Sequence, residues 1–108
     1  MTDIPKKVAK WPDGPRQIGE RLHNVISESA PELKPKSLWG APGYARDGHV
    51  VVHFRQDDGL VTFGLTEHAR LEVPGDSSDR LIPTSWALRE IDEATESRIA
   101  QIVRDAVS

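Results

Sequence analysis

Residues 44–65, YARDGHVVVHFRQDDGLVTFGL, decide the fold of this chain. Two Asp-Gly pairs, Asp47-Gly48 and Asp58-Gly59, interrupt runs that are rich in β-branched and aromatic residues. Asp-Gly supplies the positive φ angles that a two-residue type I′ turn requires, and it indicates a hairpin when extended runs flank it. The stretch therefore predicts three consecutive antiparallel strands.

The second turn also predicts which residues pair across the sheet. A two-residue turn at positions 58 and 59 places Phe54 opposite Phe63 on one apolar face, and Val52 opposite Leu65 on the same face. Tyr44 joins the other, mixed face if the first turn is also two residues long. The residues expected on that mixed face are Val51, His53, Arg55, Thr62, Gly64 and Tyr44.

Helical segments are predicted on both sides of the strands. Apolar residues recur at helical spacing between Pro15 and Ala30, and again after Asp92, a residue typical of a helix N-cap. Pro31 prevents the first helix from continuing. The two apolar stripes consist of Ile18, Leu22, Val25 and Ile26 in the first helix and of Ile99, Ile102, Val103 and Ala106 in the second.

The remaining segments complete the predicted fold. Residues 31–43 and 74–83 are rich in Pro, Gly, Asp and Ser and are expected to be loops, with short strands near Leu71–Val73 and Ser85–Ile91. The order of elements predicts an α+β fold. It has a single, mostly antiparallel sheet of four or five strands, with an N-terminal and a C-terminal helix packed on one face. The other sheet face is left uncovered.

The length and the composition indicate one domain. A chain of 108 residues is close to the commonest domain size. Residues 1–12, with three lysines and two prolines, are expected to form a flexible N-terminal arm that Trp11 anchors, and residues 13–108 to form the domain itself. The sequence contains no internal repeat.

Charge and cysteine content exclude several classes of function. With 14 basic and 17 acidic side chains the net charge is −3, which disfavours nucleic acid and anionic membranes as partners. The absence of cysteine excludes disulfides, thiolate nucleophiles and Cys-type zinc sites. No apolar run approaches the roughly 20 residues of a membrane span, and the N-terminal residues lack the apolar stretch of a signal peptide. We expect a cytoplasmic protein.

Four motifs in order resemble one protein family. They are Trp39-Gly40-Ala41-Pro42-Gly43-Tyr44, the following Asp47-Gly48-His49-Val50-Val51, then Thr62-Phe63-Gly64-Leu65, and finally residues 83–91, PTSWALREI. Together with both helices they resemble the YdhG-like bacterial domains of uncharacterised function over residues 14–107. The resemblance implies a frataxin-like fold and a label sometimes given to the family, intracellular iron chaperone. A shared fold transfers architecture more safely than activity.

The residues themselves predict weak iron binding. Iron chaperoning needs clustered carboxylates, yet the first helix offers only Glu20 and Glu28, with arginines beside them. The closest acids in sequence are Asp92, Glu93 and Glu96, which also suit the N-terminus of a helix. His49 and His53 lie roughly 13 Å apart on an extended strand, too far to share one ion. We therefore predict no metal site and no cofactor.

Four residues are the candidates for ligand binding: Trp39, Tyr44, His53 and Trp86. No nucleophile elbow and no glycine-rich phosphate loop is present, so no catalytic residue is assigned. The leading hypothesis is a binding or chaperone-type domain that presents the uncovered sheet face and the 39–44 loop to a small ligand, a metal or a protein partner. The alternatives are a homodimer that buries this face without a ligand, and an enzyme marked by a titratable group with a displaced pKa in a cleft.

Overall fold

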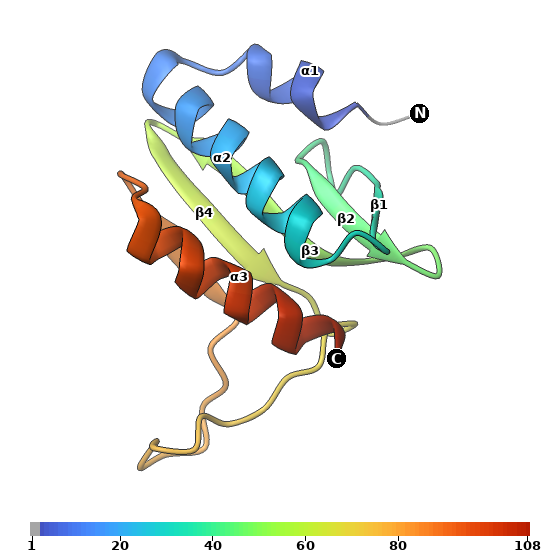
Figure 1. Ribbon diagram of the computed structural model, residues 1–108, viewed down its shortest axis with the longest axis vertical. Coiled ribbons are helices and arrows are strands. Elements are labelled where there is room, and N and C mark those ends of the chain that lie inside the picture. Colours follow the sequence, from blue (N-terminus) through green and yellow to red (C-terminus); the bar gives the residue numbers. More distant parts are fainter. Residues whose placement is uncertain (1–2) are drawn as a thin grey trace.

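The computed structural model describes residues 3–108. Five strands form one antiparallel sheet in chain order, and all three helices lie in the sequence outside the strand region (Figure 1). The elements are α1 (Ile4–Ala9), α2 (Asp13–Ser29), β1 (Lys34–Pro35), β2 (Gly43–Arg46), β3 (His49–Asp57), β4 (Leu60–Leu65), β5 (Ser85–Leu88) and α3 (Glu93–Val107). The predicted α+β class, with helices on one sheet face, is confirmed.

The register predicted for β3 and β4 is also confirmed. Phe54 pairs with Phe63 and Val52 with Leu65. Both phenylalanine rings are buried beneath the helices, where they join Leu22 of α2 and Val103 of α3 in one hydrophobic core. The turn residues Asp58 and Gly59 have φ angles of 53° and 84°, as a type I′ turn requires.

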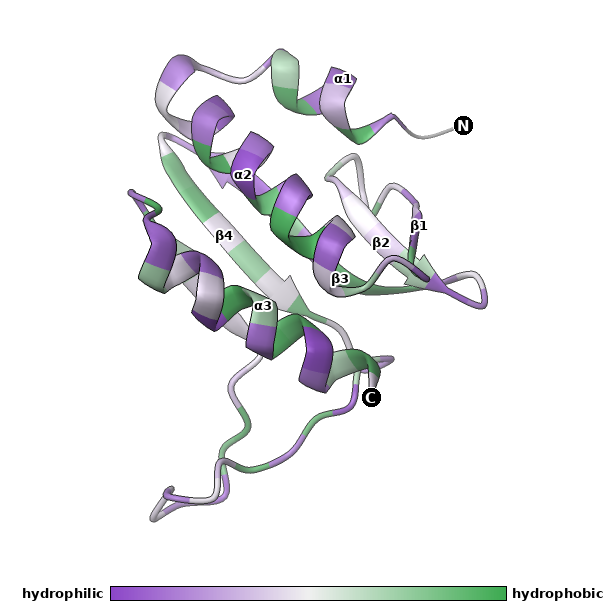
Figure 2. Cartoon of the chain, viewed as in Figure 1, coloured by the Kyte–Doolittle hydropathy of each residue, from purple (hydrophilic) through white to green (hydrophobic). Residues whose placement is uncertain are grey.

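Helices α2 and α3 cover the core face of the sheet side by side (Figure 1). Figure 2 shows both helices alternating between hydrophilic and hydrophobic residues, as amphipathic helices do. Helix α2 ends at Ser29, two residues before Pro31, as expected. Asp92 caps α3, because its Oδ1 accepts a hydrogen bond of 2.8 Å from the backbone N–H of Thr95.

The N-terminal segment differs from the flexible arm that its composition predicts. Residues 4–9 form helix α1, and the side chains of Ile4 and Val8 are fully buried. Trp11 extends this contact, with its ring edge-on to Phe54 at a centroid distance of 5.7 Å. Helix α1 is therefore held by tertiary packing against α2 and the core, which a composition rich in lysine and proline does not reveal.

A bulge changes the predicted position of Tyr44. The first turn is a two-residue turn, since Arg46 pairs with His49, but the register shifts between Tyr44 and Ala45 so that Tyr44 pairs with Val52. An extra residue in one strand reverses the side that the following residues face. Tyr44 and Val51 therefore enter the hydrophobic core, and the prediction that both lie on the uncovered face is wrong.

The segments between the strands depart from the predictions in two places. Lys34–Pro35 pairs with β2 as a short edge strand inside the predicted 31–43 loop. Residues 71–73 form no strand, and β5 ends at Leu88, before the predicted Ile91. The chain after β4 stays against the body as far as Arg70, whose N–H donates to the carbonyl of Ala106, and then runs out as a long loop that returns to β5 (Figure 1).

Candidate ligand-binding site on the uncovered sheet face

The uncovered face of the sheet has a floor of small and polar side chains. Alternation along the strands directs Phe63 and Trp86 toward the helices, and Thr62, Gly64 and Ser85 to the opposite side. Ser85 pairs with Gly64 across β4 and β5. The floor of this face therefore offers the hydroxyl groups of Thr62 and Ser85, and the ring of His53 covers Gly64.

A hollow of about 600 Å³ opens over this floor. We call it the open-face hollow and define it by six of the residues around it: Lys36, Trp39, His49, His53, Arg55 and His68. They come from the loop before β2, from β3 and from the turn after β4. Its volume lies within the range of roughly 300–1,000 Å³ that is usual for small-molecule sites.

Trp39 stands at the tip of a tight turn beside the hollow. Leu38 and Ala41 exchange two backbone hydrogen bonds of 3.0 Å, which close the turn around Trp39 and Gly40. Trp39 is 97% exposed and has a φ angle of 49°. A left-handed conformation costs an L-residue roughly 1–2 kcal/mol. The turn therefore exposes a large aromatic ring to water, and it does so in a backbone conformation that is unfavourable for tryptophan.

Two other turns of the chain provide an internal comparison. Asp47 and Asp58 have φ angles of 54° and 53°, and each is followed by a glycine at 81° or 84°. The Trp39-Gly40 turn has the same pattern, with 49° and 83°. Short polar residues such as Asp and Asn tolerate this position because their side chains bond locally. Trp39 is therefore the one large residue in this type of turn within residues 3–108.

His53 lies half-buried on the floor of the hollow. Its pKa is lowered from the ordinary value of 6.5, first by burial and second by the positive charge of Arg55. Its imidazole is therefore mostly neutral at pH 7, and a neutral ring can donate one hydrogen bond and accept another. His53 was predicted for this face, and the structure places it there beside Trp39 in one hollow.

His49 and His68 form a contact that the sequence did not reveal. Their rings stack with centroids 4.3 Å apart and planes inclined by 20°. Nε2 of His68 also lies 3.4 Å from Oε1 of Glu67. His49 thus meets His68 and not His53, because the backbone after β4 turns back over the start of β3. Thr66 holds this turn through a hydrogen bond from its hydroxyl to the carbonyl of Val50.

Charge around the hollow has the opposite sign to that of the whole chain. Lys36 and Arg55 are its permanent cations, and Glu67 is the one carboxylate among the described residues that line it. Lys36 donates from Nζ to the carbonyl of Gly48. Within residues 3–108, no carboxylate lies within ion-pair distance of Arg55. The hollow therefore carries a local excess of positive charge on a chain of net charge −3.

The other two predicted binding residues lie on the helix-covered side. Tyr44 is 2% exposed, and its hydroxyl oxygen lies 2.8 Å from Nδ1 of His23 in α2. Burial raises the pKa of Tyr44, so the phenol stays protonated. Trp86 stacks on Phe63 at 5.5 Å and borders a separate hollow of about 380 Å³ between the 70–84 loop and α3. Neither residue shares a pocket with Trp39 and His53.

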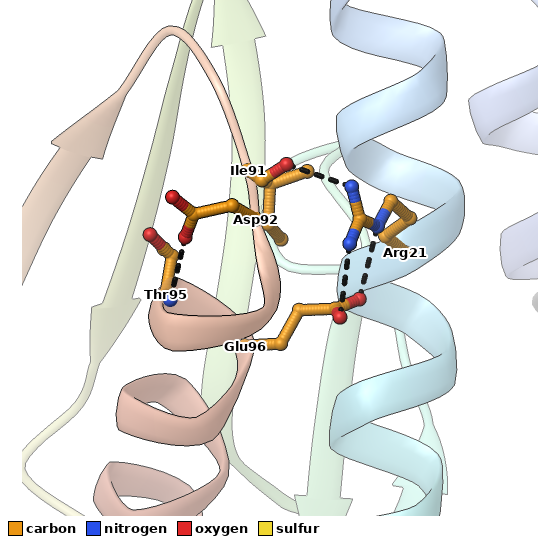
Figure 3. A network of polar contacts seen from close by, with 5 residues as sticks. All are labelled: Arg21, Ile91, Asp92, Thr95 and Glu96. Carbon is orange, nitrogen blue, oxygen red and sulfur yellow. Dashed lines mark hydrogen bonds and ion pairs between the residues drawn. The ribbon is translucent and has the colours of Figure 1, made fainter.

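Two of the three acids considered for iron, Asp92 and Glu96, have structural partners. Asp92 accepts the capping hydrogen bond from Thr95, which is the main cause of its lowered pKa. Glu96 pairs with Arg21 of α2 through two contacts of 3.0 Å, and Arg21 also donates to the carbonyl of Ile91 at 2.7 Å (Figure 3). In the part of the chain that the structure describes, no three His, Asp or Glu side chains are grouped to hold a metal ion.

No family model, curated protein or solved structure matches this chain. The resemblance to YdhG-like domains therefore stays a prediction from the four sequence motifs. Between residues 3 and 108, no helix is long and apolar enough to cross a membrane.

Proposed function

We propose that this chain is a ligand-binding domain and that the open-face hollow is its binding site. The observation that carries the proposal is Trp39, which is 97% exposed at the edge of the hollow in a left-handed backbone conformation. Strained residues that persist in a fold concentrate at functional sites. An exposed tryptophan gains a large contact area when a ligand covers it, at little cost in side-chain entropy.

The same face gives less support to a homodimer. Two sheets that bury each other need broad apolar surfaces, whereas this face has Thr62, Gly64 and Ser85 on its floor and two cations beside it. Lys36 and Arg55 would also be buried in such an interface, and burying a charge costs free energy unless it is paired.

One observation favours an enzyme as the second candidate. His53 combines a lowered pKa with a position inside a hollow, which is the combination expected of a general base. No nucleophile lies within hydrogen-bond distance of its ring among the described residues. We therefore propose binding as the first function. Catalysis would be favoured if His53→Gln abolished an activity of the protein while its ligand affinity was retained.

Membership of the YdhG-like family and a cytoplasmic location are proposed together with the binding function. Membership of the YdhG-like family, with its frataxin-like fold and iron-chaperone label, is supported by the four motifs alone. A cytoplasmic location is proposed with it, in keeping with the intracellular label of that family. The pairing of Glu96 with Arg21 supports the prediction that iron binds only weakly. An iron ion at Asp92, Glu93 and Glu96 would have to displace the arginine from Glu96.

A thermal-shift screen tests the binding function. The wild-type protein at fixed concentration is heated with single metabolites, and a true ligand raises Tm because it binds only the native state. Each hit is repeated with Trp39→Asn and with Asp58→Asn, a matched change in a similar turn away from the hollow. We expect the shift to persist in Asp58→Asn and to vanish in Trp39→Asn. Metabolites that raise the Tm of both variants equally would contradict a binding site at the open-face hollow.

A further inference from the structure

We propose that the open-face hollow selects a small anion that carries a planar ring, with the ring on Trp39 and the acidic group toward Arg55. This inference rests on the proposed binding function and adds the chemical class of the ligand. The acidic group is a carboxylate or a phosphate, which share the chemistry that arginine recognises.

The ring follows from the position of Trp39. Its indole contacts almost nothing in the protein, so both faces are open to a ligand. Leu38 and Ala41 close the base of its turn with two backbone hydrogen bonds. A planar group stacked on a pre-positioned indole gains dispersion and area burial, while the loop loses little conformational entropy. A flexible aliphatic ligand would use this surface less well.

The negative charge follows from the balance of charges around the hollow. Two permanent cations face one carboxylate, and that carboxylate already lies beside His68. Arg55 projects from β3 next to His53 without an ion pair among the described residues, so its guanidinium donors are available. A cationic ligand would meet Lys36 and Arg55 unfavourably. An anion would neutralise the local excess.

The floor of the hollow adds hydrogen-bond donors for the acidic group of the ligand. Thr62 and Ser85 lie beside Gly64 on the same sheet face as His53, and their hydroxyl groups can donate to an acidic oxygen. Gly64 leaves room for the His53 ring on this floor, since a β-carbon there would lie 3.0 Å from Cε1 of His53. A ligand can therefore place its polar end on hydroxyl donors near Arg55 while its ring reaches Trp39.

Four probes separate the ring from the charge. Naphthoate has both, naphthamide is its neutral analogue, cyclohexanecarboxylate has the charge without the planar ring, and naphthyl phosphate replaces the carboxylate. Binding is followed by calorimetry at low salt, because this readout also works for the Trp39→Asn variant, which lacks the exposed indole. We expect naphthoate or naphthyl phosphate to bind at least about tenfold more tightly than naphthamide and cyclohexanecarboxylate. Whichever of naphthoate and naphthyl phosphate binds more tightly shows whether the acidic group of the ligand is a carboxylate or a phosphate.

Two variants then assign each preference. Arg55→Gln is expected to reduce naphthoate affinity to that of naphthamide, and Trp39→Asn to reduce it to that of cyclohexanecarboxylate. Asp58→Asn is the control and keeps the wild-type affinities. Raising the salt weakens naphthoate but not naphthamide, because only the former depends on exposed charges.

The outcomes distinguish this inference from the binding function itself. If naphthamide binds as tightly as naphthoate in a manner that requires Trp39, the anion preference is wrong and the binding function stands. If the metabolite screen gives hits that require Trp39 while all four probes fail to bind, the ligand class is wrong and the binding function again stands. If neither the screen nor the probes give binding that requires Trp39, both are wrong.

Discussion

Cε1 of His53 lies 3.0 Å from the position that a β-carbon would occupy at Gly64, its pairing partner in β4. Cross-strand neighbours on one sheet face normally have β-carbons about 4.5–5.5 Å apart, and a β-carbon at Gly64 would lie much closer than that to the His53 ring, so the ring uses space that only glycine leaves free. The carbonyl oxygen of Thr84 borders the same space at 3.1 Å. The half-buried position of His53 in the open-face hollow therefore depends on Gly64.

Gly64→Ala is expected to destabilise the protein by about 1–3 kcal/mol, the usual range for overpacking. The added methyl group must displace either the His53 ring or the backbone at Thr84. Urea denaturation of Gly64→Ala, His53→Ala and the double variant measures the coupling. We expect the double variant to be more stable than the sum of the single changes predicts, because neighbouring residues are not additive. Strict additivity would show that His53 does not fill this space.

Trp39→Asn is expected to stabilise the fold by about 0.5–1 kcal/mol while it weakens ligand binding, since Asn tolerates the left-handed conformation and removal of the exposed indole costs almost no contact with the protein. Trp39→Phe serves as the comparison, because it keeps an aromatic ring and the strain. Thermal denaturation without ligand gives the result. A Trp39→Asn protein less stable than wild type would mean that the indole packs on the body.

The strand register shows which parts of the fold the sequence could and could not predict. Asp-Gly turns are local signals, so the register that pairs Phe54 with Phe63 followed directly from them. The position of Tyr44 depended on a bulge, which turns its ring into the core, where its hydroxyl meets His23 of α2. The bulge has no local sequence signature. Alternation then directs Trp86 to the core side, opposite the hollow.

Helix α1 and the partner of His68 were missed for related reasons. A six-residue helix with two apolar side chains is not stable alone, so it gives a weak sequence signal, and its stability comes from packing on α2. His68 lies in a turn whose direction is set by the hydrogen bond from Thr66 to Val50. Trp39 and His53 could be chosen from sequence because a motif and a strand register placed them.

The packing of α1 on α2 gives a matched pair of glycine substitutions within one helix. A β-carbon at Gly19 would lie 2.8 Å from the Trp11 ring and 2.9 Å from Val8, whereas one at Gly14 meets nothing within 4 Å. Gly14→Ala should be neutral or stabilise by up to about 1 kcal/mol, through helix propensity. Gly19→Ala should destabilise by about 1–3 kcal/mol.

Trp11 fluorescence supplies the second measurement. In Gly19→Ala we expect a red-shifted emission, as the ring moves away from Phe54 into water. The Gly14→Ala protein should keep the wild-type emission. Equal stability of the two variants would show that α1 does not depend on close contact with α2 at this position.

Acidification is expected to destabilise the fold below about pH 6.5. Burial is the main cause that lowers the pKa of both His23 and His53 from the ordinary value of 6.5. Between that value and the lower folded pKa, the unfolded chain binds more protons, so the free energy of unfolding falls as the pH falls. Urea denaturation from pH 7 to pH 5 measures the slope. A His23→Gln/His53→Gln variant should have a shallower slope, and an unchanged slope would assign the effect to other groups.

The contact between Arg21 and Glu96 is expected to hold α3 against α2 more strongly than a surface ion pair would. It is bidentate, with two contacts of 3.0 Å, and Arg21 also donates to the carbonyl of Ile91 just before the helix begins (Figure 3). Such a fork fixes geometry as well as charge. Glu96→Gln should therefore lower Tm, because it weakens two contacts and leaves the arginine without its counter-charge.

Arg16 and Asp13 provide the control, as they form a pair within α2 whose carboxylate side chain is 86% exposed. Double-mutant cycles compare Arg21→Gln with Glu96→Gln and Arg16→Gln with Asp13→Asn. The Arg21 cycle should give a measurable coupling that persists at high salt, since a partly buried pair is screened less than an exposed one. The Arg16 cycle should give little coupling, and less as salt is added. Equal couplings in the two cycles would mean that the Arg21 fork contributes no more than an exposed pair, and that hydrophobic packing alone positions α3.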